Sequence, residues 1–164
     1  MHKGTIGNGD NNAGHENPAY RCVETCALGA EGFEWLYERL LKRTKWANDD
    51  LYRFDLSGLS EPVGYLKYTP SSDAQPAGHY DWHVDMGGGL YSTRKLSLIV
   101  QLSDASEYTG CELQLATDKG PWTVGYKQSG DAIMFPSWTP HKVSNIESGV
   151  RRALVVWIAG PQFR

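Results

Sequence analysis

The sequence predicts a mainly β fold, a β sandwich or jelly roll with one helix packed outside it. Short segments rich in Val, Ile, Leu and aromatic residues are separated by turn-prone stretches such as TPSSDAQPAG and SDASEYTG. No strand–helix–strand alternation occurs, which argues against a parallel α/β sheet. Aromatic residues make up 12% of the chain, which favours strands or a pocket over a plain helical bundle.

Length, charge and cysteine content limit the class of protein. We expect one domain over residues 1–164, with 1–20 as a loose polar arm and a core at about 63–163. A net charge of -3 argues against nucleic acid as a partner. No segment approaches the roughly 18 consecutive apolar residues of a membrane helix. Three cysteines without a signal sequence favour a reducing compartment, so we expect a cytoplasmic protein.

A single amphipathic helix is predicted between Glu31 and Ala47. Its apolar residues recur at the spacing of one buried face, namely Phe33, Leu36, Tyr37, Leu40 and Leu41. Positive side chains lie in its last turns, where they complement the helix dipole, and the polar run 48–50 is expected to end it.

Seven later segments have the composition and length of strands. They are 51–56, 63–68, 95–102, 111–116, 131–136, 141–146 and 152–159. Their regular spacing is typical of two packed antiparallel sheets.

Two potential metal ligands stand one residue apart in the stretch YDWHVDMGGG. In a strand, residues i and i+2 point to the same face, so His83 and Asp85 would aim an imidazole and a carboxylate at one point. His141, which opens a later predicted strand, is the best candidate for a third ligand. Two histidines and one carboxylate with open coordination positions are typical of non-haem Fe(II) oxygenases. A histidine–spacer–aspartate motif alone is weak, since it often arises by chance in turns.

Five motifs follow one another in the order found in a known family. They are His83-Val84-Asp85, RKLSLIVQL (94–102), GCEL (110–113), GDAIMFPSWTPHKV (130–143) and GVRRALVVW (149–157). Over about residues 63–163 the chain resembles the 2-oxoglutarate and Fe(II)-dependent oxygenases, specifically the prolyl 4-hydroxylase-like branch. The resemblance implies a double-stranded β-helix, the jelly roll of that family.

The resemblance also implies a cofactor set and roles for the site residues. Fe(II) would be held by His83, Asp85 and His141, and 2-oxoglutarate would chelate the iron and react with O2 to give succinate and CO2. Arg151 occupies the family position for the distal carboxylate of 2-oxoglutarate, because a guanidinium matches a carboxylate with two parallel hydrogen bonds. Ascorbate is the expected reductant.

Two further residues match positions near the co-substrate, with alternatives left open. Tyr68 matches a family tyrosine whose hydroxyl reaches the co-substrate, but a buried core tyrosine is an equal interpretation. Gln101 stands where some relatives carry a second tyrosine, and it is expected to donate a hydrogen bond instead.

The favoured substrate is a prolyl residue in a peptide or protein. Arg94 and Trp157 match positions that contact the target segment in peptide prolyl hydroxylases, although Trp157 equally suits core packing. The loop 69–78 and the glycines 87–89 are expected to form mobile flaps over the substrate. The alternatives are a hydroxylase of a free amino acid or other small molecule, a cupin-like metal enzyme of another reaction type, and a jelly-roll binding module without catalysis.

Overall fold

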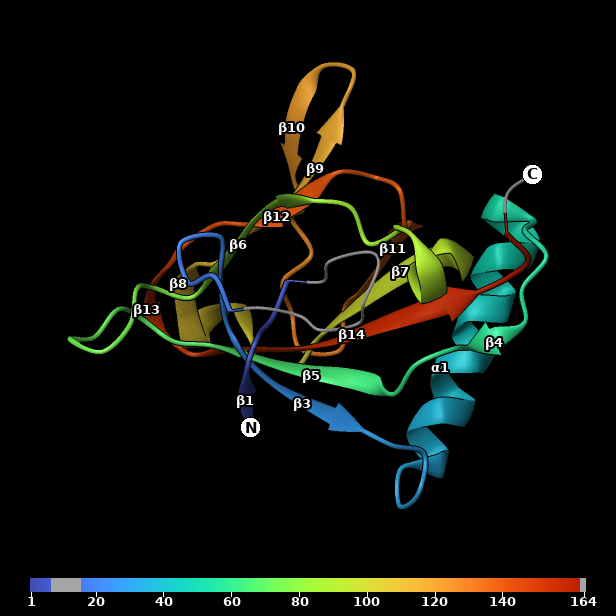
Figure 1. The fold of residues 1–164 in the computed structure, drawn as a ribbon, viewed down its shortest axis with the longest axis horizontal. Helices are drawn as coiled ribbons and strands as arrows, with labels where there is room; N and C mark the ends of the chain where they lie inside the picture. Colours follow the sequence, from blue (N-terminus) through green and yellow to red (C-terminus); the bar gives the residue numbers. More distant parts are fainter. Residues whose placement is uncertain (7–15, 163–164) are drawn as a thin grey trace.

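Two antiparallel β-sheets pack face to face in the computed structural model, which describes residues 1–6 and 16–162 (Figure 1). The larger sheet has the order β1 (His2–Lys3), β3 (Glu24–Leu28), β5 (Val63–Tyr68), β14 (Arg151–Ala159), β7 (Arg94–Gln101) and β11 (Ala132–Pro136), with β4 (Gly58–Leu59) paired to β14. The smaller sheet has the order β10 (Gly120–Thr123), β9 (Leu113–Thr117), β12 (His141–Val143), β6 (His79–His83) and β2 (Arg21–Cys22). A separate pair, β8 (Tyr108–Gly110) and β13 (Ile146–Gly149), lies at one end of the molecule. The predicted mainly β jelly roll is confirmed.

Strand β14 shows why the larger sheet needs cover on both faces. Its odd-numbered residues, including Ala153 and Val155, belong to the core between the two sheets. Its even-numbered residues, including Leu154 and Val156, belong to a second core on the outer face. Because successive side chains of a strand point to opposite faces, a nearly continuous apolar run requires a partner on each side.

Helix α1 (Glu34–Ala47) provides that outer cover. Leu36 and Leu40 are buried in the second core with the outward side chains of β14 and β7. The predicted helix packed outside the sheets is therefore confirmed. Leu41 was predicted to be buried, but it is 40% exposed, because the buried stripe follows Leu36, Leu40 and Thr44 instead. No helix among the described residues is long and apolar enough to span a membrane.

The ends of α1 differ from the prediction. The helix begins at Glu34 rather than Glu31, since the preceding turn contains Gly32 at φ 80°. It does not stop at 48–50 but continues as a π-helical turn, η1 (Asn48–Tyr52), which ends at Arg53 in the left-handed conformation with φ 55°.

The strand predicted at 51–56 is therefore wrong. Its first residues lie in the π-helical turn, and the buried Asn48 amide pairs with both backbone groups of Phe54, accepting from its N–H at 3.0 Å and donating to its carbonyl at 2.9 Å. A side-chain amide here replaces the sheet hydrogen bonds that the apolar composition suggested.

The remaining predicted strands are present with shifted ends. The segments 63–68, 131–136 and 152–159 correspond to β5, β11 and β14, and 95–102 corresponds to β7, which begins at Arg94. The segment 111–116 begins later, as β9, because Cys111 lies in a turn at φ 52°. The segment 141–146 divides between β12 and β13. Short 3-10 turns, η2 (Gly89–Thr93) and η3 (Ala105–Glu107), complete the chain.

Candidate metal centre

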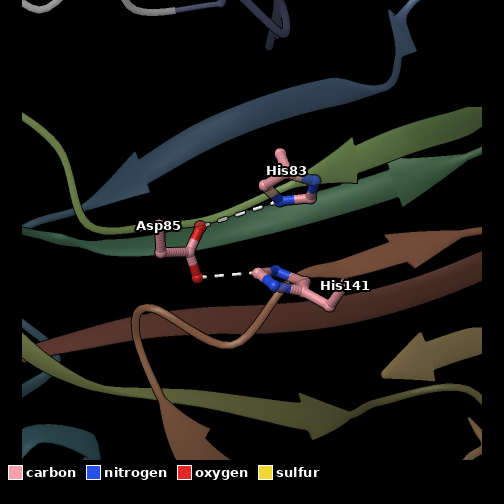
Figure 2. A group of neighbouring side chains, drawn as sticks. All are labelled: His83, Asp85 and His141. Atoms are coloured by element: carbon pink, nitrogen blue, oxygen red, sulfur yellow. Dashed lines mark ion pairs between the residues drawn. The ribbon is translucent and has the colours of Figure 1, made fainter. Parts of the chain in front are cut away.

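Three side chains from two distant parts of the sequence, His83 and Asp85 from one and His141 from the other, come together (Figure 2). His83 ends β6, His141 begins β12, and the two histidines are direct partners in the antiparallel register. The Asp85 carboxylate lies beside the two rings and faces both, with Oδ1 3.7 Å from His83 Nε2 and Oδ2 3.6 Å from His141 Nε2. The candidate ligand atoms all lie within 4.8 Å of one another, so a single ion can reach all three.

Asp85 reaches this point from a turn rather than from a strand. Strand β6 ends at His83, and the backbone N–H of Asp85 donates to the carbonyl of Ser137 at 2.9 Å. Val84 is 46% exposed and points away, as predicted. The expected convergence of His83 and Asp85 is observed. The carboxylate is held in place by the loop before β12, however, and not by the alternation of side chains along a strand.

Both imidazoles are fixed in the tautomer that a metal requires. His83 Nδ1 lies 2.7 Å from the carbonyl of Asp81, and His141 Nδ1 lies 2.9 Å from the carbonyl of Thr139. A carbonyl can only accept a hydrogen bond, so each Nδ1 carries a proton and donates it. Each Nε2, which faces Asp85, is left with its lone pair.

Burial keeps the site in the protonation state of a metal centre. Desolvation, with the nearby His141 adding to it, lowers the pKa of His83 to about 4, so this imidazole is neutral at pH 7. Burial alone would raise the pKa of the Asp85 carboxyl, but His141, His83 and the Ser97 hydroxyl together hold it below its ordinary value. The carboxylate is therefore ionised while the imidazole beside it is neutral.

Buried hydroxyls support the carboxylate, a feature that the sequence did not reveal. Ser97 Oγ donates to Asp85 Oδ2 at 2.6 Å, and Ser137 Oγ lies 3.0 Å from Ser97 Oγ. Both serines are fully buried. Their only signal in the sequence was polar side chains in otherwise apolar segments.

An aromatic ring stacks on one ligand because of an irregularity in the smaller sheet. The rings of Tyr80 and His83 lie parallel with centroids 3.5 Å apart. Residues three apart point to opposite faces of a regular strand, but here Tyr80 to His83 opposes only His141 to Val143 of β12. This extra residue in β6 is a bulge, which places Tyr80 and His83 on one face. The alternation of apolar and polar residues in the sequence does not reveal such a bulge.

Arg94 is buried and fully engaged with the protein. It forms a bidentate ion pair with Glu61, at 2.7 and 2.6 Å, and its Nη1 donates to the carbonyl of Asp85 at 2.9 Å. Its guanidinium also lies over the rings of Trp157 and Tyr91, 3.7 and 4.2 Å from their centroids. The predicted substrate contact by Arg94 stays a prediction, but its donors are already paired and its observed contacts position Asp85.

Trp157 stacks against the Arg94 guanidinium. Its indole is half-buried against the inner core and lines the cavity described below, so it combines the two interpretations that the sequence left open. Its Nε1 is buried without a hydrogen bond of normal geometry, although the indole helps to lower the pKa of Asp85.

A second polar group lies deeper between the sheets, around Arg151. This side chain is 1% exposed and has no carboxylate partner among the described residues. Its Nε donates to Gln101 Oε1 at 3.1 Å, Nη1 lies 4.0 Å from Cys111 Sγ, and Nη2 has no partner. The guanidinium carbon lies 5.3 Å from the ring centroid of Tyr68, its direct partner across the sheet. An isolated buried charge is costly, so this arrangement indicates an anion site.

Tyr68 and Gln101 both belong to this deeper group. Tyr68 is 1% exposed, and burial raises its pKa to about 12, so it is a neutral hydroxyl at pH 7. Gln101 uses its oxygen to accept from Arg151, and the predicted donation from its amide to the co-substrate stays a prediction. Arg152, the next residue, points outward and pairs with Glu107 at 3.6 Å, as the strand alternation requires.

A cavity of about 660 Å³ opens beside His83 and Asp85. Its walls include the N-terminal strands, the loop after Asp85 and the larger sheet, with Tyr20, Arg21, Glu61, Gly87, Gly88 and Trp157 among its lining. The glycines thus lie where a flap was predicted. The loop 69–78 is not among the lining of this cavity. It folds on itself at Ser72 and Gln75 and projects from one end of the molecule (Figure 1), and its role as a flap stays a prediction.

Comparison with known proteins agrees with this geometry. The family model described as the 2OG-Fe(II) oxygenase superfamily matches residues 64–159, more than half of the chain. A PKHD-type hydroxylase of Synechococcus sp. (strain CC9311) is 32% identical over 87 residues, which are 53% of this chain and 39% of that protein. A second, from Synechococcus sp. (strain CC9902), is 39% identical over 79 residues, or 48% and 35%. The chain matches well under half the length of these relatives.

Solved structures share the fold at low sequence identity. A Pseudomonas putida prolyl-4-hydroxylase superposes with a TM-score of 0.69 at 18% identity, covering 88% of this chain and 75% of that one. A prolyl hydroxylase from Trichoplax adhaerens, in complex with a hypoxia inducible factor peptide fragment, gives a TM-score of 0.74 at 16% identity, covering 97% and 70%. At such identities the likeness concerns the fold alone, while the family match rests on the sequence. The chain belongs to the 2OG-Fe(II) oxygenase superfamily.

Proposed function

We propose that this chain is a 2-oxoglutarate- and Fe(II)-dependent dioxygenase that hydroxylates prolyl residues in peptides or proteins. The observation that carries the proposal is the unpaired, buried Arg151 at depth between the sheets, on the same inner face as the ligand group. Between Ser97, beside Asp85, and Gln101, beside Arg151, the strand rises roughly 13 Å. Because the arginine side chain is long, the distance from its guanidinium to the ligand group is shorter than this rise and suits a small dicarboxylate that contacts both.

The donor set fits a ferrous ion. His83, Asp85 and His141 offer two imidazole nitrogens and one carboxylate oxygen, and the open cavity beside them leaves room for further ligands. A structural zinc site would be closed and rich in thiolates, which this set lacks. When bound, the iron and its co-substrate supply oxidation of a C–H bond by O2, with succinate and CO2 as the other products. Ascorbate as the reductant belongs to the same proposal.

The residues around Arg151 fit the distal carboxylate of 2-oxoglutarate. Nη2 has a donor to spare, and Gln101 holds Nε so that the guanidinium plane is fixed. The neutral Tyr68 hydroxyl adds a potential donor on the neighbouring strand. Buried donors of fixed orientation bind an anion strongly because little water competes with it.

A peptide suits the cavity better than a small molecule alone. Its volume of about 660 Å³ is open along one side, and its lining combines aromatic rings with backbone of the glycine stretch. The two structural neighbours described above are prolyl hydroxylases, which supports proline as the target. A free amino acid is the second candidate, since the same cavity admits one. We include a cytoplasmic setting in the proposal, supported by the three free thiols Cys22, Cys26 and Cys111.

Two measurements test the proposal. The protein is incubated with Fe(II), ascorbate, 2-oxoglutarate and proline-containing peptide libraries, and succinate release and a mass gain of one oxygen are followed together. We expect succinate formation coupled to a mass gain on proline. Succinate formation with free proline only would favour the small-molecule hydroxylase. Metal binding without succinate would favour a cupin-like enzyme, and neither metal binding nor turnover would favour a binding module.

A further inference from the structure

The cavity beside the candidate metal centre contains a second arginine, Arg21, at the first position of β2. Its guanidinium carbon lies 4.5 Å from the ring centroid of Tyr80, which in turn stacks on His83 at 3.5 Å. Arg21, Tyr80 and His83 therefore form a three-layer stack on the inner face of the smaller sheet. The guanidinium carbon thus lies at most about 8 Å from the His83 ring, a distance that two or three residues of an extended chain span.

Arg21 differs from Arg94, the other arginine that lines the cavity, in its partners. Arg94 has a bidentate carboxylate, a backbone carbonyl and two aromatic rings. Arg21 has no carboxylate within ion-pair distance among the described residues, and its Nη1 donates only to the carbonyl of Thr5 at 2.5 Å. The charge of Arg94 is thus neutralised by Glu61, whereas none of the described carboxylates pairs with Arg21.

The position of Arg21 is fixed before any ligand arrives. Its Nε is buried without a partner, and Gly4 packs so closely that a Cβ there would lie 2.8 Å from this nitrogen. The stack on Tyr80 and the bond to Thr5 hold the rest of the guanidinium at the cavity wall. A pre-positioned, partly desolvated cation loses little conformational entropy when an anion binds to it.

We propose that Arg21 selects substrates that carry a carboxylate close to the hydroxylated residue. This inference rests on the proposed function and specifies one further property of the substrate, namely its negative charge. A neutral carbonyl would satisfy one donor of the guanidinium, but only an anion offsets the unbalanced charge as well. The carboxylate belongs either to an acidic side chain near the target proline or to the α-carboxylate of a free amino acid.

A purely structural role for Arg21 makes a different prediction. The bond to Thr5 and the packing under Gly4 join the N-terminal segment to the smaller sheet. If that were the whole role, loss of the guanidinium would lower stability and weaken every ligand to the same extent. A substrate role instead makes the effect depend on the charge of the ligand.

The test is a binding measurement that does not require turnover. Fluorescein-labelled proline peptides carry Asp, Asn or Lys at each of three positions on either side of the proline, and anisotropy is measured on protein with Mn(II) and 2-oxoglutarate in the absence of O2. Free proline and prolinamide, added as competitors, separate an α-carboxylate from a side-chain acid. The variants are Arg21→Gln, Arg21→Lys and Arg21→Glu, with Arg152→Gln as the matched control because Arg152 lies on the outer face.

If the carboxylate is an acidic side chain, we expect the wild-type protein to bind one of the Asp peptides about tenfold more tightly than the corresponding Asn peptide, as a charge-assisted hydrogen bond predicts. If it is an α-carboxylate, we expect the protein to bind proline about tenfold more tightly than prolinamide. Arg21→Gln should abolish the preference, Arg21→Lys should keep part of it, Arg21→Glu should transfer it to the Lys peptide, and Arg152→Gln should leave it unchanged.

Absence of any charge preference in the wild-type protein, or an equal loss for all ligands in Arg21→Gln, overturns the inference. Succinate release in the wild-type protein, measured separately, shows whether the proposed function itself has failed.

Discussion

The hydroxyl of Ser97 donates a 2.6 Å hydrogen bond to Oδ2 of Asp85, and both side chains are buried. Ser137 in turn lies 3.0 Å from Ser97, so the carboxylate is held from one side by a pair of hydroxyls. One of its two oxygens is thereby engaged, and Oδ1, which faces His83, remains the better donor to a metal. The pair therefore sets how the carboxylate is presented to the ion.

Loss of the Ser97 hydroxyl should weaken metal binding without abolishing the fold. Outer partners of metal ligands typically contribute 10–100-fold to metal affinity, so we expect Ser97→Ala to weaken binding of Fe(II) or Co(II) about tenfold. Anaerobic titration followed by the Co(II) absorption spectrum measures this. Ser97→Thr keeps the hydroxyl and should restore most of the affinity. Equal affinity in the wild-type and Ser97→Ala proteins would show that the hydrogen bond does not orient the carboxylate.

Arg151 should determine the affinity for 2-oxoglutarate. Arg151→Gln removes a charge-assisted pair with the distal carboxylate, so we expect the concentration for half-maximal turnover to rise at least about tenfold. Binding of 2-oxoglutarate to the Mn(II)-loaded protein, followed by calorimetry, provides a second readout. Arg152→Gln is the matched control, because that side chain faces outward beside Glu107. The same rise in the control would mean that the effect is general and that Arg151 does not bind the co-substrate.

Much of the architecture followed from the sequence because apolar alternation fixes the faces of strands. In β14 the side chains alternate between the two faces of the sheet. Arg151 and Trp157 therefore point to the inner face, and Arg152 and Leu154 point to the outer face. The convergence of the three candidate ligands was predicted as well, but it arises differently, because a turn held by the Ser137 carbonyl positions Asp85. The π-helical turn at 48–52 was not predicted, since its composition matched a strand and the Asn48 amide decides its conformation.

Other parts of the site depend on contacts that no local pattern encodes. Tyr80 stacks on His83 only because β6 carries a bulge. Arg94 was expected to touch substrate, but its partner Glu61 lies 33 residues earlier in a loop, where nothing in the sequence marks it. Arg21 was missed for the same reason, because its place beside Tyr80 and His83 depends on a contact between strands that are far apart in the sequence.

Breaking the ion pair between Glu61 and Arg94 should destabilise the protein. Arg94 is 7% exposed, so Glu61→Gln leaves a largely buried guanidinium without its counter-charge, and we expect a loss of about 2 kcal/mol in the free energy of unfolding. Urea denaturation of the metal-free protein measures it. Glu107→Gln breaks the more exposed pair with Arg152 and should change stability by less than about 1 kcal/mol. A loss in Glu61→Gln as small as in this control would show that Arg94 is stabilised by its aromatic neighbours instead.

The metal-free protein should lose stability as the pH falls from about 6.5 to about 4. Burial lowers the pKa of His83 from 6.5 to about 4, so in this window the unfolded chain binds a proton that the folded protein does not. The stability contributed by the neutral imidazole is complete above pH 6.5 and disappears as the pH falls through the folded pKa. The loss is at most about 3.5 kcal/mol, since the pKa differs by about 2.5 units and one unit corresponds to about 1.4 kcal/mol. Urea denaturation in chelator at several pH values should show this slope in the wild-type protein and a flatter one in His83→Gln.

The lowered pKa of Asp85 acts in the same direction, but only near and below its ordinary value of 3.8, so the two groups act in separate pH ranges. An equal slope in His83→Gln between pH 6.5 and 4 would assign the acid sensitivity to another group.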